Sequence, residues 1–594
     1  MAFQDFDLIS QRRENERKRK LKRRITIAVV STTVLALVAA AAVCAVVYKD
    51  RLYPNSSQTQ NHGNAHPAHH PPTQPAQSPA QKAVKTICAS TDYKQTCEDN
   101  LFKAVKANAS ALQPKDLLKA SMTAISGGID LAMKIGSSVH FDDPKAKIAF
   151  DFCMTLLGDA KDELNSSISS IDDKTSNAGD LNNWLSAVMS YQQSCIDGFP
   201  NGTIKSQLES TLKSSKELTS NSLAMVSLSQ LASFHGTSIK RRLLTKGSGI
   251  PSLDEEGLPR WLNDQESRRI LKDNTTFQHP NATVAKDGSG NYTTINAALA
   301  AIPSNYTGRY VIYVKAGVYE ETVTVTKKMV NVTIYGDGSQ KSIVTGSKNY
   351  VDGVPTFLTA TFSALGDGFM AQSIGFRNTA GPEKHQAVAL RVQSDRAIFV
   401  NCRMEGYQDT LYAQTHRQYY RSCYITGTVD FIFGDAAAVF QNCMIYVRKP
   451  MDNQQNIVTA QGRVDKRETT GIVLQGCRIL ADASLGPVKS QFKSYLGRPW
   501  KEYSRTIIME TEVGDFIHGD GYMPWQGNFA LNTLYYAEYN NKGPGAQTSA
   551  RVKWPGYKGL IKRDEALKYT VGPFIQGEGW LKVDNVPVHF GLYA

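Results

Sequence analysis

The pattern of apolar and polar residues changes character partway along the chain. Between residues 83 and 234, apolar residues recur at the spacing of one helix face, as Ile148, Phe152 and Leu156 do, and polar stretches separate long amphipathic runs. From residue 278 to 592, short β-branched and aromatic runs such as YVIYV and VNVTIYG alternate with Gly and Asn turns. The pattern therefore predicts a multidomain protein, with an all-α domain followed by an all-β domain.

A repeat of about 20 residues runs through the predicted all-β region. Cys402, Cys423 and Cys443, at intervals of 21 and 20 residues, are each preceded three positions earlier by an aromatic side chain, and residues 473–477 echo the pattern. One coil of a parallel β-helix has about this length, and equivalent positions on successive coils stack roughly 4.8 Å apart. We therefore expect a right-handed parallel β-helix.

The start of the chain has the composition of a membrane anchor. Residues 25–48 contain no charged side chain, and this stretch is long enough to span a bilayer and longer than the usual apolar core of a cleaved signal peptide. The basic residues at 17–24 should stay in the cytosol. We expect a cytosolic tail at 1–24 and a transmembrane signal anchor at 25–48 in the single-pass type II orientation, with a cleaved signal peptide as the alternative.

Two polar segments separate the expected folded units. Residues 49–82 are rich in His, Pro, Gln and Asn, a composition that cannot bury a core and is typical of a flexible linker. Residues 235–277 form a second linker, which contains a dibasic motif followed by two leucines: Arg241, Arg242, Leu243 and Leu244. Such a motif is accessible to a processing protease, although an ordinary charged linker has the same composition.

Four cysteines fall in the helical region, at Cys88, Cys97, Cys153 and Cys195. An even number in an exported segment indicates disulfide bonds, and four cysteines allow three pairings. The short spacing of Cys88 and Cys97 favours a local bond, which leaves Cys153 and Cys195 to join two helices. The Asn-X-Ser/Thr sequons that follow the predicted anchor also fit the secretory route, where they accept glycans.

The charge balance bears on the partners of the protein. The net charge is +13, and the C-terminal half is mildly basic. A basic surface suits a polyanion, either nucleic acid or an acidic polysaccharide, although ordinary surface charge gives the same balance. The all-β region has no cluster of His, Cys and carboxylates with convincing metal spacing, so no metal or cofactor is expected.

Paired acids and paired amides follow the repeat. Asp409 and Asp430 are 21 residues apart and Gln386 precedes Gln408 by 22, so each pair should stack on neighbouring coils. Two stacked carboxylates repel, and one should keep its proton unless a cation intervenes. Arg498, in the sequence GRPW, is the candidate cation, which would keep one Asp ionised as a nucleophile beside a protonated acid. Taken singly, an Asp in a β-helix more often stabilises a turn, and a Gln more often lies at the surface.

Five motifs around these positions resemble, in order, the signature blocks of plant pectin methylesterases (pectinesterases). They are GVYEE at 317–321, QAVAL at 386–390, QDTL at 408–411, DFIFG at 430–434 and LGRPW at 496–500. This resemblance covers residues 278–592. Residues 83–234 resemble the pectin methylesterase inhibitor family, a four-helix bundle with the same arrangement of cysteines, and are interpreted as a pro-region.

The resemblance implies a role for each candidate residue. Asp430 would be the nucleophile that attacks the ester carbonyl, and Asp409 would protonate the departing methanol and then activate water. Gln386 and Gln408 would stabilise the oxyanion, and Arg498 would orient Asp430. The residues expected to contact substrate are Thr356, Gln386, Tyr412, Phe433, Arg498, Trp500 and Trp525. The resemblance also implies a disulfide bond between Cys423 and Cys443, with Cys402 and Cys477 as buried thiols.

The implied function is hydrolysis of the C6 methyl esters of homogalacturonan in the plant cell wall, through an aspartyl acyl-enzyme. The helical domain would silence the enzyme during export, until a subtilisin-like protease cleaves after Leu244. Inhibition of separate enzymes by this domain is the alternative. Separate inhibitor proteins are a further expected partner, and nucleic acid is not.

Rival functions fit the residues less well. A glycoside hydrolase or lyase on the same fold also uses paired carboxylates, but its oxocarbenium ion does not need the two glutamines that an oxyanion needs. The chain contains no Gly-X-Ser-X-Gly motif, which argues against a serine esterase. A catalytically inactive binding protein is disfavoured because both Asp, both Gln and the Arg are present.

Overall fold

A computed structural model of the protein describes residues 79–107, 113–137, 144–171, 177–199, 202–227, 279–582 and 586–593. The predicted anchor at 25–48 and the dibasic motif at 241–244 lie outside these residues. Within the described ranges, no helix combines the length and the apolar character needed to cross a membrane.

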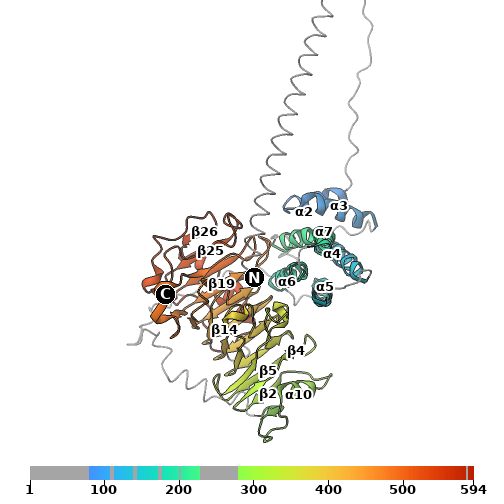
Figure 1. The fold of residues 1–594 in the computed structure, drawn as a ribbon. Coiled ribbons are helices and arrows are strands. Elements are labelled where there is room, and N and C mark those ends of the chain that lie inside the picture. Colours follow the sequence, from blue (N-terminus) through green and yellow to red (C-terminus); the bar gives the residue numbers. More distant parts are fainter. Residues whose placement is uncertain are drawn as a thin grey trace, which may run out of the picture. The chain divides into compact units, whose positions relative to one another are not determined.

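The described helical region consists of two short and four long helices. They are α2 (Pro79–Cys88), α3 (Lys94–Ala107), α4 (Pro114–Ser137), α5 (Pro144–Ser170), α6 (Ala178–Asp197) and α7 (Thr203–Ser227). α4 and α5 each begin with a proline, which is preorganised for the first turn of a helix. The long helices pack on one another around a core rich in Leu and Ile, in agreement with the predicted bundle (Figure 1).

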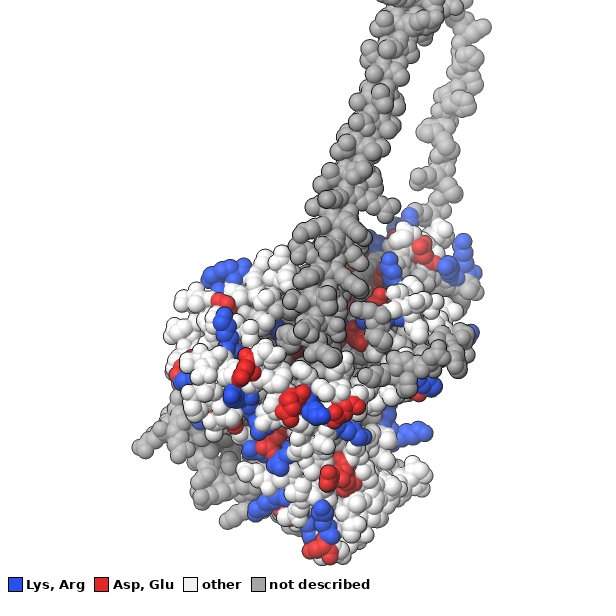
Figure 2. Space-filling model, viewed as in Figure 1, with Lys and Arg blue, Asp and Glu red and all other residues white. Residues whose placement is uncertain are grey.

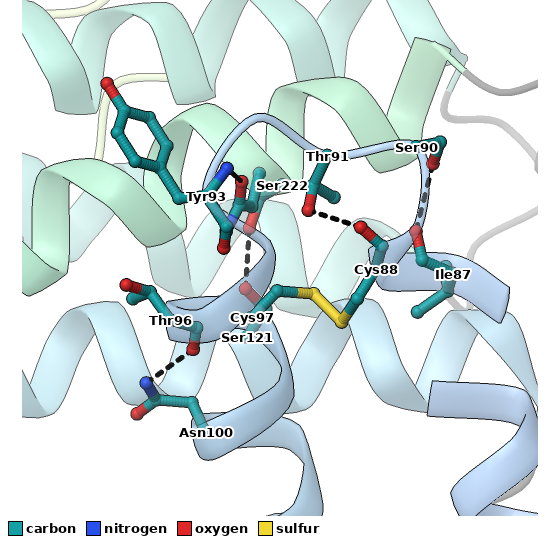
Figure 3. The surroundings of a disulfide bond; sticks show 11 residues. Ile87, Cys88, Ser90, Thr91, Tyr93, Thr96, Cys97, Asn100, Ser121 and Ser222 are labelled. Atoms are coloured by element: carbon teal, nitrogen blue, oxygen red, sulfur yellow. Dashed lines mark hydrogen bonds between the residues drawn. A yellow bond between two sulfur atoms is a disulfide. The ribbon is translucent and has the colours of Figure 1, made fainter. Parts of the chain in front are cut away.

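Both disulfide bonds predicted for the bundle are present. Cys88 and Cys97 join the end of α2 to α3, as Figure 3 shows, and Cys153 and Cys195 join α5 to α6. The first bond spans 9 residues and the second spans 42. Each bond restricts the unfolded chain, and the longer loop gains the more from closure.

The remaining described chain winds through three parallel sheets, in agreement with the predicted parallel β-helix (Figure 1). The eleven-stranded sheet contains β1 (Ala282–Val284), β2 (Tyr310–Val314), β5 (Val332–Gly336), β8 (Met370–Gln372), β11 (Ala397–Val400), β14 (Arg417–Arg421), β17 (Ala437–Gln441), β20 (Gly471–Gln475), β23 (Arg505–Met509), β25 (Tyr535–Tyr539) and β26 (Tyr557–Leu560). The eight-stranded sheet contains β3 (Gly317–Glu320), β6 (Ser342–Gly346), β9 (Gly375–Asn378), β12 (Arg403–Glu405), β15 (Tyr424–Gly427), β18 (Met444–Val447), β21 (Arg478–Ala481) and β24 (Glu512–Val513).

The seven-stranded sheet is the one that positions the candidate site. It contains β4 (Val323–Val325), β7 (Phe362–Ala364), β10 (Leu390–Val392), β13 (Leu411–Ala413), β16 (Ile432–Gly434), β19 (Asn456–Gln461) and β22 (Ser494–Gly497). Three short helices also occur in this half of the chain: α10 (Ile295–Ala300), α11 (Arg563–Leu567) and α12 (Val571–Ile575).

The sequence repeat stacks aromatic rings inside the β-helix. Phe399 is paired in register with Tyr420, and Tyr420 with Phe440. Their ring centroids lie 4.9 and 4.3 Å apart with nearly parallel planes, and all three side chains are fully buried. The interval of the repeat is thus the length of one coil.

The cysteines of the repeat form a second ladder, in which the predicted Cys423–Cys443 disulfide bond is absent. Cys402, Cys423, Cys443 and Cys477 are all buried free thiols. Cys423 Sγ donates to the carbonyl oxygen of Phe399 at 3.4 Å, and Cys443 Sγ donates to that of Tyr420 at 3.5 Å. One-coil spacing is compatible with a disulfide bond. The prediction is wrong in this structure, in which both thiols are free and each donates to a carbonyl oxygen of the preceding coil.

We expect the aromatic ladder to contribute strongly to stability. Replacing Phe440 by Ala should destabilise the β-helix by about 3–5 kcal/mol, because the rigid coils cannot close the gap beside Tyr420. The measurement is the midpoint of denaturant unfolding. Val318→Ala is the control, since Val318 is 48% exposed and the change should stay within about 0.5 kcal/mol. Equal midpoints for the two variants would contradict this assignment.

Candidate active site

The two candidate acids occupy equivalent positions on neighbouring coils. Leu411 of β13 pairs with Ile432 of β16, and Asp409 and Asp430 each stand two residues before these partners. The Asp409 N–H donates to the carbonyl oxygen of Val429 at 3.0 Å. Both aspartates have left-handed backbone conformations, with φ of 62° and 51°, which Asp tolerates better than most residues. The repeat thus places the two aspartates at the same backbone position of neighbouring coils.

The two glutamines come from the same edge of the seven-stranded sheet. The N–H of Ala387, next to Gln386, donates to the carbonyl oxygen of Gln408 at 3.2 Å, so the pair also spans one coil. Among the described residues, Gln386 Oε1 is buried without a hydrogen-bond partner. The oxygen side of this amide is therefore not held by another protein group.

Arg498 binds one acid of the pair with both arms of its guanidinium. Its Nε donates to Asp430 Oδ1 at 2.8 Å and one terminal nitrogen donates to Asp430 Oδ2 at 2.5 Å. The residue directly follows β22, and its N–H donates to the carbonyl oxygen of Thr459 at 3.0 Å, which fixes the backbone. The ring of Trp525 lies 4.4 Å from the guanidinium carbon. Such a fork holds a carboxylate in its ionised form.

The environment separates the protonation of the two acids. Burial and the charge of Asp430 raise the pKa of Asp409 well above its usual range, and Arg498 offsets only part of this rise. Burial works against the charge of Arg498, yet the carboxylate of Asp430 outweighs it and the pKa of Arg498 is raised. The site therefore favours the neutral form of Asp409 beside the carboxylate that Arg498 binds.

Aromatic side chains line the outward face of the same sheet. Tyr412 and Phe433 stack with ring centroids 4.4 Å apart, and Trp500 stands edge-on to them at 6.5 and 6.0 Å. Thr356 begins the short 3₁₀ helix Thr356–Leu358, in which Phe357 packs into the same cluster. The structure thus brings together Tyr412, Phe433 and Trp500, with Thr356 at the border of the group.

Sequence reasoning missed Arg391, which lies on this face between the aromatic residues and the polar edge. It pairs in register with Tyr412 and donates to Gln414 Oε1 at 2.6 Å and to Gln393 Oε1 at 2.9 Å. Side chains alternate between the two faces of β10, and Leu390 and Val392 point into the core. This alternation could have predicted that Arg391 points outward, toward the site. Arg391 adds a buried cation to the floor of the site.

The helical bundle contacts this site in the full chain. The described residues belong to one compact unit that extends from Gln77 to Ala594. Phe152 of α5 stacks on Phe357 and packs into the aromatic cluster, and the guanidinium of Arg391 lies 5.3 Å from its ring. Of the predicted helix face, only Leu156 is fully buried in the bundle core, because Phe152 turns toward the β-helix and Ile148 is exposed.

α6 closes the space over the aromatic residues. Asp197 at its end pairs with Lys501 at 2.7 Å. The cavity left between α6 and the residues Tyr412 and Trp500 has a volume of about 10 Å³. That is about enough for one water molecule and far too small for a sugar ring.

Comparisons with known proteins identify a family for each of the two regions of the chain. The family described as Pectinesterase matches residues 281–578, and the family described as Plant invertase/pectin methylesterase inhibitor matches residues 82–225. Putative pectinesterase/pectinesterase inhibitor 45 of Arabidopsis thaliana is 49% identical over the whole of both chains. Pectinesterase 1 of Citrus sinensis is 42% identical over 86% of this chain and 88% of that protein.

A solved structure is similar to about half of the chain. The pectin methylesterase from carrot is 53% identical, with a TM-score of 0.53, over 53% of this chain and 99% of that chain. These likenesses confirm the resemblance inferred from the five motifs and from the helical region. The chain belongs to the pectinesterase family, and it is a carboxylic ester hydrolase that carries an N-terminal domain of the pectin methylesterase inhibitor family.

Proposed function

We propose that this pectinesterase cleaves the C6 methyl esters of homogalacturonan through an acyl-enzyme on Asp430, and that its own bundle inhibits it until the linker is cut. Hydrolysis of pectin methyl esters is the activity of the family. The observation that supports the covalent route is the asymmetry of the acid pair. Both carboxylate oxygens of Asp430 accept hydrogen bonds from Arg498, whereas burial and the charge of Asp430 raise the pKa of Asp409.

The proposed reaction has two steps. Asp430 attacks the ester carbonyl, and the side-chain amides of Gln386 and Gln408 stabilise the oxyanion. Asp409 gives its proton to the departing methoxy group, and methanol leaves. Asp409, now a carboxylate, takes a proton from water, whose oxygen attacks the acyl-enzyme and releases Asp430. Each cycle consumes one water and yields one methanol and one galacturonate carboxyl group.

The test of the reaction is a paired assay on highly methylated pectin. We expect methanol release without new reducing ends, because the glycosidic bonds stay intact. Release of reducing ends at a comparable rate would support the rival glycoside hydrolase.

Autoinhibition is supported by the bundle residues that fill the site. Phe152 occupies the aromatic cluster, and α6 leaves no room for a sugar over Tyr412 and Trp500. We infer that a subtilisin-like protease cuts near Arg241 and Arg242 and that the released enzyme works in the cell wall, where separate inhibitor proteins can take the place of the bundle. A membrane anchor at 25–48 would hold the uncut precursor in the secretory pathway.

We expect the Phe152→Ala variant of the uncut chain to release methanol about tenfold faster than the uncut wild type. The loss of the ring weakens the contact with Phe357 and lets the bundle open more often. The control is Phe102→Ala, since Phe102 packs within the bundle itself. After cleavage of the linker and removal of the bundle, all three proteins should have the same rate. Equal rates before cleavage would refute the blocking role of Phe152.

Processing at the dibasic motif is a separate expectation. Replacing Arg241 and Arg242 by Ser should leave an uncut precursor, detected by its size on an immunoblot of secreted and intracellular fractions. Normal cleavage and export of that variant would show that the motif is incidental.

A further inference from the structure

Ion pairs between the bundle and the β-helix have a single polarity in the described part of the chain. Every carboxylate comes from the bundle and every cation from the β-helix. The pairs are Asp92 with Lys466 (2.6 Å) and Arg467 (2.8 Å), Asp159, Asp162 and Glu163 with Lys327 (3.6, 3.8 and 3.2 Å), Glu163 with the imidazole of His416 (3.5 Å), Asp180 with Arg396 (3.1 Å) and Arg417 (2.7 Å), and Asp197 with Lys501 (2.7 Å). On the face of the molecule in Figure 2, by contrast, basic and acidic side chains are interspersed.

We call the six Lys and Arg side chains among these partners the basic rim: Lys327, Arg396, Arg417, Lys466, Arg467 and Lys501. Along the chain they come after β4, β10, β13, β19 and β22 of the seven-stranded sheet, and Arg417 is itself the first residue of β14 in the eleven-stranded sheet. Six strand spacings separate β4 from β22, which gives the rim a length of roughly 29 Å. Asp409 and Asp430 stand before strands of the same sheet, so the rim and the acids flank opposite edges of its aromatic face.

Most of the rim has no carboxylate partner within the β-helix. In the described ranges, Lys327, Lys466, Arg467 and Lys501 form ion pairs only with the bundle. Arg417 and Arg396 also pair with Asp395, at 2.6 and 3.9 Å, which ties both of them to the β-helix itself. Removal of the bundle would therefore leave a row of cations without counter-charges, and such a row attracts polyanions.

The proposed reaction produces a polyanion, whose negative charge is opposite to the positive charge of the basic rim. Each turnover converts a neutral ester on the polymer to a carboxylate, so the product chain gains negative charge as the enzyme works. We propose that the basic rim binds the carboxylates of de-esterified galacturonan, and that the acidic face of the bundle occupies this surface in the uncut chain. The proposal rests on the proposed function and extends it, because it assigns the product stretch of the polymer to a surface beside the catalytic cleft.

Two consequences distinguish this surface from a docking site for the bundle alone. The released enzyme should stay on a chain that it has partly de-esterified, since the rim holds the product while the cleft receives the next ester. De-esterified polymer should also compete with the bundle for the rim, and salt should weaken both contacts.

The experiment uses the full chain with a site for a sequence-specific protease in place of residues 241–244. After cleavage and removal of the bundle at high salt, binding of polygalacturonate is measured by titration at low and at moderate salt. The test variant is Lys327→Gln with Arg396→Gln, because these side chains remain 29% and 46% exposed and Arg417 is left to hold Asp395. The matched control is Lys489→Gln with Lys558→Gln, which removes the same charge elsewhere.

We expect the rim variant to bind polygalacturonate about tenfold more weakly and with a smaller salt dependence, while the control stays within about twofold of the wild type. Equal affinity of the rim variant and the control would overturn the proposal and leave the rim as a contact for the bundle only. Binding is measured without turnover, so this result does not depend on the catalytic assignment. Methanol release from a short methylated oligomer is measured in parallel, and its absence from all three proteins would instead count against the proposed function.

Discussion

Replacing Asp430 by Asn should reduce methanol release from methylated pectin by roughly 10⁴-fold or more, the scale expected when a nucleophile is removed. Asn has the same shape as Asp but cannot attack the ester carbonyl. It also leaves one arm of the Arg498 guanidinium facing an amide N–H in place of a carboxylate oxygen. The assay compares kcat of the wild type and the variant, both cut in the linker and freed of the bundle.

The control for this loss is Asp482→Asn. Asp482 accepts hydrogen bonds from the N–H and the hydroxyl of Ser484 at a surface turn, away from the acid pair. Its kcat should match that of the wild type. If Asp430→Asn kept more than about a tenth of the wild-type kcat with unchanged polygalacturonate binding, a water-activating base elsewhere would have to replace the proposed nucleophile.

The repeat was the strongest source of information in the sequence. Stacked rings such as Phe399 and Tyr420 must recur once per coil, so their interval measures the coil and places Asp409 over Asp430. Arg498 lies 68 residues from Asp430 and two strands along the sheet, and no interval predicted that contact. The contact was expected from the GRPW motif and its resemblance to a pectin methylesterase signature block. The bidentate ion pair between Arg498 and Asp430 agrees with that expectation.

Contacts between the two domains could not be predicted. The hydrophobic pattern of a helix shows which face is apolar but not which domain that face contacts. Phe152 follows the helical spacing and was assigned to a core face, yet its ring fills the aromatic cluster of the β-helix. The Cys423–Cys443 bond illustrates another limit. Spacing gives the distance between stacked cysteines but not whether each thiol prefers a disulfide bond or the carbonyl of the preceding coil.

The pH dependence of the Arg498 variants tests how the two acids divide their roles. The first step needs Asp430 ionised and Asp409 protonated, so kcat/KM of the wild type should follow a bell-shaped curve, with its limbs belonging to the coupled pair. Activity should fall at low pH as Asp430 takes up a proton. It should fall at high pH as Asp409 loses its proton, at a pH well above the usual range because burial and Asp430 raise the pKa of Asp409.

Replacing Arg498 by Ala should move both limbs to higher pH and lower the maximum of kcat/KM by roughly 10²–10³-fold. Without the cation, the carboxylate of Asp430 loses its ion-pair partner, and Asp409 loses the interaction that partly offsets the rise in its pKa. Arg498→Lys should recover part of the shift, because it keeps a charge but lacks the planar fork that binds both oxygens of Asp430. Arg478→Ala is the control, since Arg478 pairs with Glu512 on another sheet and its loss should leave both limbs in place. The curves are measured at fixed ionic strength on enzyme freed of the bundle. A loss of activity in Arg498→Ala with unmoved limbs would mean that the arginine binds the substrate and does not set the protonation of the acid pair.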